Sequence, residues 1–287
     1  MKQFKKGFTL IELLAVLSIM SFISSIVIAS LSSAREKARI TAAAEANANL
    51  SHSFVTMAYW SFDDGTANDY VGGNNGTPSA GITFSTNTFN GKGKSASFNG
   101  GGGIIVADKP DLNFGTSRSF ALGSWVKTTS KAHKRVLSKG HYGFSPGYVL
   151  QIHCCDIDGS EQLTAGINTT YMYTSNVQVS DNKWHYLAAV FDRQKQTITA
   201  YVDGQPVKPK TSVVCGTIRG YVLDISSCTA NATTADPVCI GAGDSSCANE
   251  YFNGLIDEPT IFSDIVLTAN DIKNLYAIGL IKHSISF

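Results

Sequence analysis

The sequence has almost no excess of charge of either sign. Its 287 residues contain 23 lysines and arginines against 22 aspartates and glutamates, a net charge of +1 at pH 7. Lys2, Lys5 and Lys6 all precede Phe8, so the chain from Phe8 onward carries 1 − 3 = −2. A protein that binds nucleic acid neutralises phosphates with basic side chains. We therefore expect no nucleic-acid partner.

The sequence also lacks the patterns of a zinc site and of a glycosidase. No Cys-x-x-Cys pair occurs among its six cysteines, and no histidine stands at the usual ligand spacing. Glycosidases hold two carboxylates about 5–10 Å apart. The nearest approach is Asp257-Glu258, and neighbouring residues of a strand point to opposite faces. We expect no serine or cysteine nucleophile elbow to accompany His185, and predict that the chain is not an enzyme.

A long apolar segment near the N-terminus is the most informative part of the chain. The 24 residues from Phe8 to Leu31 contain one charge, Glu12. As a helix they span about 36 Å, which exceeds the roughly 30 Å of a bilayer core. A carboxylate inside such a helix costs about 2.5–3.5 kcal/mol at the bilayer centre, so Glu12 needs a positive partner. The free amino group of Phe8 on a neighbouring chain, exposed if the chain is cut after Gly7, would supply one.

This N-terminus resembles that of type IV pilins and pseudopilins. A basic peptide ending in Gly7 is followed by Phe-Thr-Leu-Ile-Glu and an apolar helix, and the match covers residues 2 to about 40. The resemblance implies cleavage between Gly7 and Phe8 by a prepilin peptidase and N-methylation of Phe8. It also implies that the helices pack into a filament core, with Glu12 in the assembly role.

Two other interpretations of this segment remain open. A secretory signal also has a basic start, and Ser32-Ser33-Ala34 resembles a cleavage site, but its apolar region is usually 7–15 residues long. A single-pass anchor explains the length but gives Glu12 no purpose.

Composition divides the chain into three parts. Residues 1–7 form the leader. Residues 8–57 form the apolar helix and a stem, because residues 32–57 contain Ala, Arg, Glu and Asn but no Gly or Pro, which favours a continuing helix. Residues 58–287, the head, are richer in Gly, Asn, Ser and Thr.

Charge and cysteines indicate that the head is exported. The leader lysines stay in the cytoplasm under the positive-inside rule, which places the chain in the inner membrane with its head outside. The six cysteines, Cys154, Cys155, Cys215, Cys228, Cys239 and Cys247, all lie in this part. An even number in an oxidising compartment favours disulfides, with 15 complete pairings. We expect Cys154 and Cys155 to pair with distant partners, so that the loop 215–247 is cross-linked to the strand end near 154.

The sequence of the head predicts an antiparallel β-sandwich. Residues 119–126 alternate, with Phe120, Leu122 and Val126 on one face, and residues 184–191 are apolar on both faces, as in a central strand. Thr268-Ala269-Asn270-Asp271 has the form of a capping box for a short closing helix, with Gly279 as its C-terminal cap. The fold class is therefore α+β: a long N-terminal helix, an all-β sandwich and a short C-terminal helix.

The head resembles the laminin G-like, concanavalin A-like jelly rolls. Seven segments carry the resemblance in order: 59–63, 69–76, 93–98, 119–125, 181–185, 201–204 and 252–258. Relatives of this type hold a structural calcium between the N-terminal loop and the last strand, which would bring Asp69 and Asn74 to Asp257. Asp and Asn are also ordinary turn formers.

Carbohydrate is the ligand class that this resemblance favours. Sugar sites use exposed aromatic rings, and the candidates are Tyr142, Phe144, Tyr148, Tyr171 and Tyr173, although aromatic residues of a sandwich are more often in the core. The insert at about 208–236, with Cys215 and Cys228, is either a ligand-facing flap or a disulfide-held decoration.

The sequence thus predicts a pilin-like subunit that displays a lectin-like head on an extracellular filament for adhesion or glycan binding. Its partners would be other pilin subunits, the prepilin peptidase, the inner membrane and a carbohydrate or cell-surface ligand. The alternatives are a membrane-anchored receptor that does not polymerise and a filament-borne glycosidase.

Overall fold

The structure is a computed structural model of the whole chain, which divides into two compact units, Met1–Ala46 and Asn47–Phe287. It describes residues 10–14, 16–24, 56–131, 133–140, 146–154, 161–168, 170–174, 177–212 and 215–282. Gly7, Phe8, Cys155, Tyr142 and Phe144, about which the sequence made predictions, lie outside these residues.

The described part of the first unit is helical over residues 10–14 and 16–24. Ser21 Oγ donates a hydrogen bond to the Leu17 carbonyl oxygen at 2.8 Å. Glu12 lies in the first of these helical stretches and is exposed. Among the residues that are described, none belongs to a helix both long and apolar enough to span a bilayer. The predicted helix over 8–57 is therefore described only in its first part.

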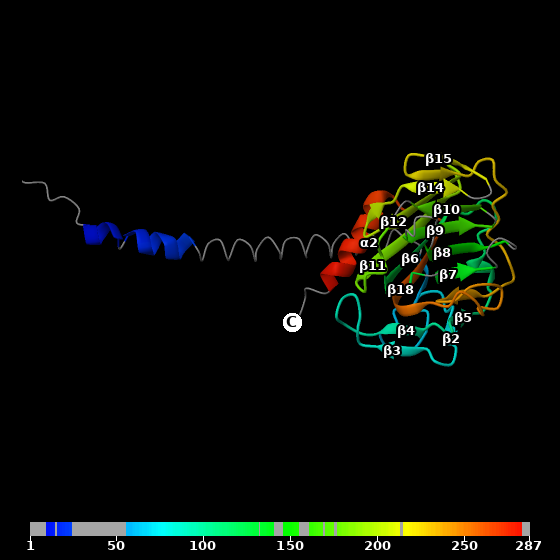
Figure 1. Cartoon of the computed structure of the whole chain (residues 1–287), viewed down its shortest axis with the longest axis horizontal. Helices are drawn as coiled ribbons and strands as arrows, with labels where there is room; N and C mark the ends of the chain where they lie inside the picture. The colour runs from blue at the N-terminus through cyan, green and yellow to red at the C-terminus, as the bar shows by residue number, and fades with distance from the viewer. Residues whose placement is uncertain are drawn as a thin grey trace, which may run out of the picture. The chain divides into compact units, whose positions relative to one another are not determined.

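The head is an antiparallel sandwich of two sheets (Figure 1), as predicted. The ten-stranded sheet, here called sheet A, has the strand order β15 (Thr217–Arg219), β16 (Val222–Asp224), β12 (Thr197–Val202), β11 (Trp184–Asp192), β6 (Phe120–Lys127), β18 (Asn253–Ser263), β4 (Ser95–Asn99), β3 (Thr83–Ser85). β1 (Thr56–Tyr59) also pairs with β18, and β13 (Gln205–Pro206) with β12.

The eight-stranded sheet, sheet B, forms the other layer. Its strand order is β14 (Pro209–Ser212), β10 (Thr170–Thr174), β9 (Glu161–Ile167), β8 (Tyr148–Cys154), β7 (Lys134–Lys139), β17 (Val238–Ile240), β5 (Ile104–Val106), β2 (Gly76–Pro78). A short 3₁₀ helix, η1 (Pro110–Leu112), follows β5. Because strands distant in sequence are neighbours in both sheets, the core is made by long-range pairing.

The main core lies between the sheets, and β6 contributes every second side chain to it. Phe120, Leu122 and Val126 all enter this core, as the sequence predicts, and Phe120 stacks on Phe114 and on Phe191 with ring centroids 4.3 Å apart. The intervening residues of β6, Ala121 and Trp125, belong to a second apolar cluster on the outer face of sheet A. β6 is therefore buried on both faces.

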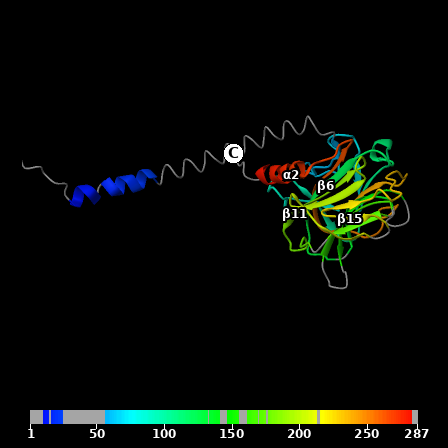
Figure 2. The ribbon, with the colours of Figure 1, turned by 90° about the horizontal axis from the view of Figure 1, so that it is seen from above.

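The helix α2 (Ala269–Lys282) covers that outer face. It lies alongside β11 and β6 in both views (Figures 1 and 2). Thr268 and Asp271 form the predicted cap: Asp271 Oδ2 accepts from Thr268 N at 2.7 Å, and Thr268 Oγ1 accepts from Asp271 N at 3.2 Å. Gly279 as the C-terminal cap is wrong, since α2 continues past it to Lys282. It is a close-packing position instead, where a Cβ would come within 2.5 Å of the Trp125 ring.

The disulfides close two local loops. Cys215 pairs with Cys228 and Cys239 pairs with Cys247, across 13 and 8 residues of sequence. The predicted cross-link from the loop 215–247 to the strand end near Cys154 is therefore wrong, because the four cysteines of the loop pair with one another. The Cys215–Cys228 bridge closes the loop that contains the β15–β16 hairpin. The Cys239–Cys247 bridge lies next to the Gly243–Asn249 β-bridge.

Candidate functional site

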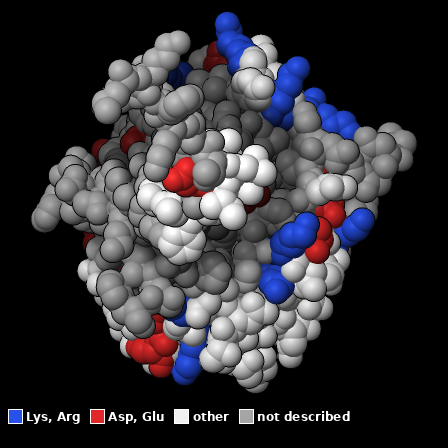
Figure 3. All heavy atoms as spheres, turned by 90° about the vertical axis from the view of Figure 1, so that its left-hand side faces the viewer, with Lys and Arg blue, Asp and Glu red and all other residues white. Residues whose placement is uncertain are grey.

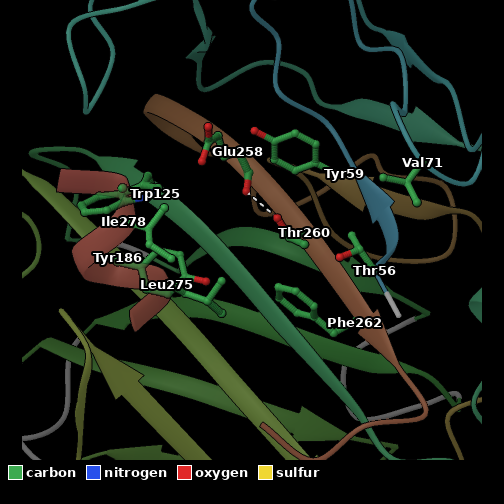
Figure 4. Close-up of a pocket in the computed structure, with 11 residues that line it drawn as sticks. Thr56, Tyr59, Val71, Trp125, Tyr186, Glu258, Thr260, Phe262, Leu275 and Ile278 are labelled. Atoms are coloured by element: carbon green, nitrogen blue, oxygen red, sulfur yellow. Dashed lines mark hydrogen bonds between the residues drawn. The ribbon is translucent and has the colours of Figure 1, made fainter. Parts of the chain in front are cut away.

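The head contains a pocket of about 220 Å³ over the outer face of sheet A, where α2 leaves β18 and β1 uncovered. Figure 4 shows Thr56, Tyr59 and Val71 on one side and Trp125, Tyr186, Leu275 and Ile278 on the other. Glu258, Thr260 and Phe262 of β18 lie between them, and Gly279 completes the lining. Its wall is mostly apolar, with one carboxylate.

An irregularity in β18 places that carboxylate in the pocket. The pairing register of β18 with β6 shifts between Asp257 and Thr260, and Glu258 has φ 46°, a left-handed backbone conformation. Its backbone oxygen accepts from Thr260 Oγ1 at 3.0 Å (Figure 4), and its side chain is hydrogen-bonded to the Tyr59 hydroxyl. The sequence analysis assumed a regular strand, in which Asp257 and Glu258 point to opposite faces. It therefore could not predict the conformation that this irregularity gives Glu258.

Asp257 lies next to Glu258 in β18 and is buried outside the pocket lining. Its side chain is 2 % exposed, and its Oδ1 accepts from Glu258 N at 3.0 Å. Burial raises the pKa of Asp257 to about 9, with further upward contributions from the charges of Glu258 and Asp63. Burial and the same acidic neighbours also raise the pKa of the Tyr59 hydroxyl. Asp257 therefore keeps its proton at neutral pH, where an isolated aspartate would be ionised.

Two aromatic rings of the pocket, Trp125 and Tyr186, already contact other rings of the protein. The Trp125 ring is stacked against Phe89 at 4.4 Å between centroids and against Tyr276 at 5.4 Å, and it also lies 5.4 Å from the Tyr186 ring. A sugar stacks on a ring face that is open to solvent. Trp125 does not offer such a face.

Of the three predicted calcium ligands, Asp69 and Asn74 lie together in one loop, and Asp257 lies in β18. Asp69 and Asn74 are brought together, but Asp69 serves as the hub of its loop. Its Oδ1 accepts from Tyr59 N and Val71 N, both at 2.9 Å. Its Oδ2 accepts from Gly72 N at 3.0 Å and from Asn74 N and Nδ2 at 2.8 Å.

Five N–H donors occupy the lone pairs that a cation would need, so Asp69 does not fit as a ligand in this arrangement. Within the described residues, no group of three or more His, Cys, Asp or Glu side chains is placed to hold a metal ion. Asp257, the third predicted ligand, is buried beside Glu258 and apart from the Asp69 hydrogen-bond network.

The exposed aromatic residues of the head differ from those the sequence suggested. Tyr148 and Tyr171 are 2 % and 3 % exposed: Tyr148 lies in the core between the sheets, and Tyr171 packs with Val149 in a separate small cluster. Tyr173 has a described backbone in β10 only. The rings that the described residues do expose are Tyr70 and Tyr221, at 53 % and 55 %. In the sequence, the exposure of these two rings is indicated only by their positions in expected turns, after Asp69 and after Gly220.

Tyr221 lies at the tip of the predicted insert. Residues 217–224 form the β15–β16 hairpin, which pairs with the edge of β12 and extends sheet A. Beside the tip, Arg219 Nε lies 2.8 Å from Asp224 Oδ2. The insert therefore combines an exposed ring with a paired cation and carboxylate, held by the Cys215–Cys228 bridge.

His185, which the sequence analysis considered for catalysis, lies between two carboxylates. His185 Nδ1 lies 2.8 Å from Asp203 Oδ2 and its Nε2 lies 3.0 Å from Asp181 Oδ1. These carboxylates raise the pKa of His185, the Asp203 hydrogen bond contributing most. Residues 143–147 do spell Gly-x-Ser-x-Gly, contrary to our expectation, but they precede strand β8 and not the helix that a nucleophile elbow requires.

Sheet B carries an unusual pair of buried polar side chains. Gln151 and Thr164 are partners in the β8–β9 register and both are 0 % exposed. Both amide atoms of Gln151 and the Thr164 hydroxyl are without a hydrogen-bond partner in the described structure. Such groups cost stability when left unsatisfied.

On the face seen in Figure 3, Lys and Arg side chains lie beside Asp and Glu side chains at several places among the described residues. This agrees with the balanced composition.

Comparisons with known proteins agree with both halves of the sequence prediction. Residues 2–28 match the family model of the prokaryotic N-terminal methylation motif. Residues 98–273 match that of the concanavalin A-like lectin/glucanases superfamily. A search of curated proteins found no match.

Solved structures share the fold of the head at low sequence identity. Domain 4 of AbnA, an extracellular arabinanase from Geobacillus stearothermophilus solved with arabinotriose, superposes with a TM-score of 0.54 at 20% identity. That superposition covers 78% of this chain and 98% of the domain. The binding domain of botulinum neurotoxin serotype D has a TM-score of 0.53 at 16% identity over 79% of this chain and 52% of its own length. At these identities the similarity establishes the fold alone.

Proposed function

The chain belongs to the concanavalin A-like lectin/glucanases superfamily, and on that premise we propose that it is a type IV pilin-like subunit whose head is a glycan-binding module. The subunit enters the inner membrane through its N-terminal helix, with the head outside, and is then assembled into an extracellular filament. The methylation motif at residues 2–28 supports the first part of this proposal.

The observation that carries the proposal is the exposure of the N-terminal helix. Ten large apolar side chains between Leu10 and Ile23 are 45% to 78% exposed. Each square ångström of apolar surface left in water costs about 25 cal/mol. A helix of this kind needs either lipid or other copies of itself, and the proposed subunit meets each in turn.

Glu12 selects between lipid alone and self-assembly. After a prepilin peptidase cuts between Gly7 and Phe8, the methylated amine of Phe8 is positively charged. In the filament that amine lies beside Glu12 of a neighbouring subunit and neutralises it away from water. A receptor anchored singly has no such partner for Glu12.

Substitution of Glu12 in the full-length chain tests the assembly role. Glu12→Ala should abolish filaments seen by electron microscopy while leaving the head detectable on the membrane. Glu36→Ala, an acid of the stem, is the matched control and should assemble normally. Filaments that form normally with Glu12→Ala would support the anchored receptor. Mass spectrometry of the mature chain should find methylated Phe8 as its first residue.

For the glycan-binding part, we place the contact at the tip of the β15–β16 hairpin. Tyr221 presents an open ring, and the Arg219–Asp224 pair beside it offers the donors and acceptors that sugar hydroxyls require. The Cys215–Cys228 bridge fixes this tip and lowers the entropy lost on binding.

Tyr221→Ala should weaken binding of the full-length chain to glycans on an array by about tenfold, as expected for a lost stacking contact of about 1.5 kcal/mol. Tyr70→Ala, which removes a ring of almost equal exposure, is the control and should bind normally. Equal effects of the two variants would contradict this assignment. Release of free sugar by the wild-type protein would favour the filament-borne glycosidase.

A structural calcium remains part of the proposal, centred on Asp257. Calcium takes carboxylate and carbonyl oxygens, and Asp257 beside Glu258 offers two carboxyl groups at which calcium would compete with the proton on Asp257.

A further inference from the structure

We infer that the tip of the β15–β16 hairpin selects saccharides that carry a carboxylate. The inference rests on the proposed function, because it names the class of glycan that the binding site proposed there takes. The Arg219 guanidinium would bind the carboxylate, and the Tyr221 ring would pack on the sugar that carries it.

The Arg219 guanidinium has N–H donors left for such a ligand. Its Nε lies 2.8 Å from Asp224 Oδ2. Within the described residues the guanidinium makes no other contact with an oxygen atom, so the edge formed by its two terminal nitrogens remains open. A carboxylate binds such an edge through two parallel charge-assisted hydrogen bonds, which are stronger than those that a neutral hydroxyl group accepts.

The cation is the outward-facing partner of this ion pair. The Arg219 side chain is 70% exposed, whereas that of Asp224 is 17% exposed. Asp224 Oδ1 also accepts a hydrogen bond from Ser226 N at 3.0 Å, so this carboxylate is held at the base of the hairpin. A ligand that approaches from the solvent therefore meets the positive charge first.

The chain around the hairpin is basic, although the protein as a whole is not. Residues 204–235 contain Lys208, Lys210 and Arg219 against one acid, Asp224, which gives 3 − 1 = +2. Both lysines are exposed, and β14, which contains Lys210, lies beside β15 (Figure 1). Charges within about 8–10 Å act on one another at physiological salt. This part of the surface therefore favours an anionic ligand over a neutral one.

The turn of the hairpin keeps Tyr221 close to this guanidinium. Arg219 and Val222 are cross-strand partners, so Gly220 and Tyr221 form a two-residue turn, and Gly220 has the positive φ, 61°, that such turns require. The Tyr221 side chain is 55% exposed. In a sugar acid the carboxyl carbon is bonded directly to the sugar ring. A sugar packed on Tyr221 would therefore present its carboxylate at the edge of the tyrosine ring, one residue away from Arg219.

A glycan array printed in two forms tests the inference with the full-length chain in detergent. One form is untreated, and in the other the carboxyl groups are converted to methyl esters, which removes their charge and leaves the rest of each sugar unchanged. We expect the bound glycans to carry a carboxylate and esterification to lower binding by about tenfold, the effect of losing a two-point contact with a charged group. Bound glycans that are neutral, or esters that bind as well as the acids, would overturn the inference.

Charge variants test whether Arg219 is the group that recognises the carboxylate. Arg219→Gln should weaken binding of the acidic glycans by about five- to tenfold and leave binding of their esters unchanged, and Arg219→Lys should have a smaller effect. Lys183→Gln is the matched control, because Lys183 Nζ lies 2.9 Å from Asp181 Oδ2 and its side chain is 78% exposed. This control should bind as the wild type does. Equal losses in Arg219→Gln and Lys183→Gln would show that net charge alone attracts the glycan, contrary to the inference.

The outcomes separate this inference from the proposed function. Binding of neutral glycans that is lost in Tyr221→Ala would leave the proposed site in place and overturn the ligand class alone. A full-length chain that binds no glycan on either form of the array would overturn the glycan-binding part of the proposed function, and this inference with it.

Discussion

Replacing Asp257 with asparagine should flatten the pH dependence of the stability of the head. The Asp257 carboxyl is 2 % exposed and lies near Glu258 and Asp63, which together with burial raise its pKa to about 9 from an ordinary value of 3.8. Between these two values the folded head retains a proton that the unfolded chain releases. Folding therefore becomes less favourable as the pH rises through this window.

The magnitude follows from one proton. Each pH unit between the two pKa values lowers the free energy of unfolding by about 1.4 kcal/mol. From pH 5 to pH 8 the wild-type head should thus lose about 4 kcal/mol relative to Asp257→Asn, whose amide can still accept the hydrogen bond from Glu258 N. That loss is a large part of a typical total stability of about 5–15 kcal/mol.

Chemical denaturation of the full-length chain in detergent, followed by tryptophan fluorescence at several pH values, measures this difference. The experiment should be run with a chelator and again with calcium. A bound calcium ion keeps the carboxylate ionised, so calcium should stabilise the wild type near pH 8 and leave the variant unchanged. If the wild type and Asp257→Asn show the same slope in chelator, the argument from burial and repulsion is wrong.

Three further predictions concern the stability of the head and are checked by the same denaturation assay. His185 is held by two aspartates that raise its pKa, so this bond stabilises the head below the ordinary pKa of histidine and is lost as the pH rises through the raised value. His185→Gln should therefore cost about 1.5–3 kcal/mol at pH 5.5 and less at pH 9; an equal cost at both would refute the charge pairing. Gln151→Leu should raise the free energy of unfolding by about 1–3 kcal/mol, because it removes a buried amide without partners; destabilisation would show that the amide has a use we have not identified. Replacing Cys215 and Cys228 by serine should cost about 3 kcal/mol, as for a closed loop of about 15 residues, and an unchanged midpoint under oxidising conditions would contradict this.

The strand pattern and the N-terminal motif could be predicted from the sequence because both are local. The alternation of β6 placed Phe120, Leu122 and Val126 in the core, as observed. The capping box at Thr268 and Asp271 was also correct, since four consecutive residues contain all of its atoms. The basic leader with Gly7, Phe8 and Glu12 in register identified the methylation motif, which the family comparison confirms.

The errors arose where distant segments meet. Gly279 looked like a helix end, but its place was decided by the Trp125 ring of β6. The disulfide pairing was wrong because sequence spacing cannot show which loop ends lie together. The candidate sugar-binding rings Tyr148 and Tyr171 proved to be buried, since alternation does not indicate which face of a strand is covered.

By itself the sequence determined what kind of chain this is: an apolar helix with one acid, followed by a sandwich of alternating strands. Its periodicities and its leader are properties of neighbouring residues. Only the tertiary structure decided which groups share a site. The bulge in β18 places Glu258 beside Tyr59, about 200 residues earlier in the chain, in a pocket that α2 also lines. Contacts of that kind depend on strand order and register, which no local pattern contains.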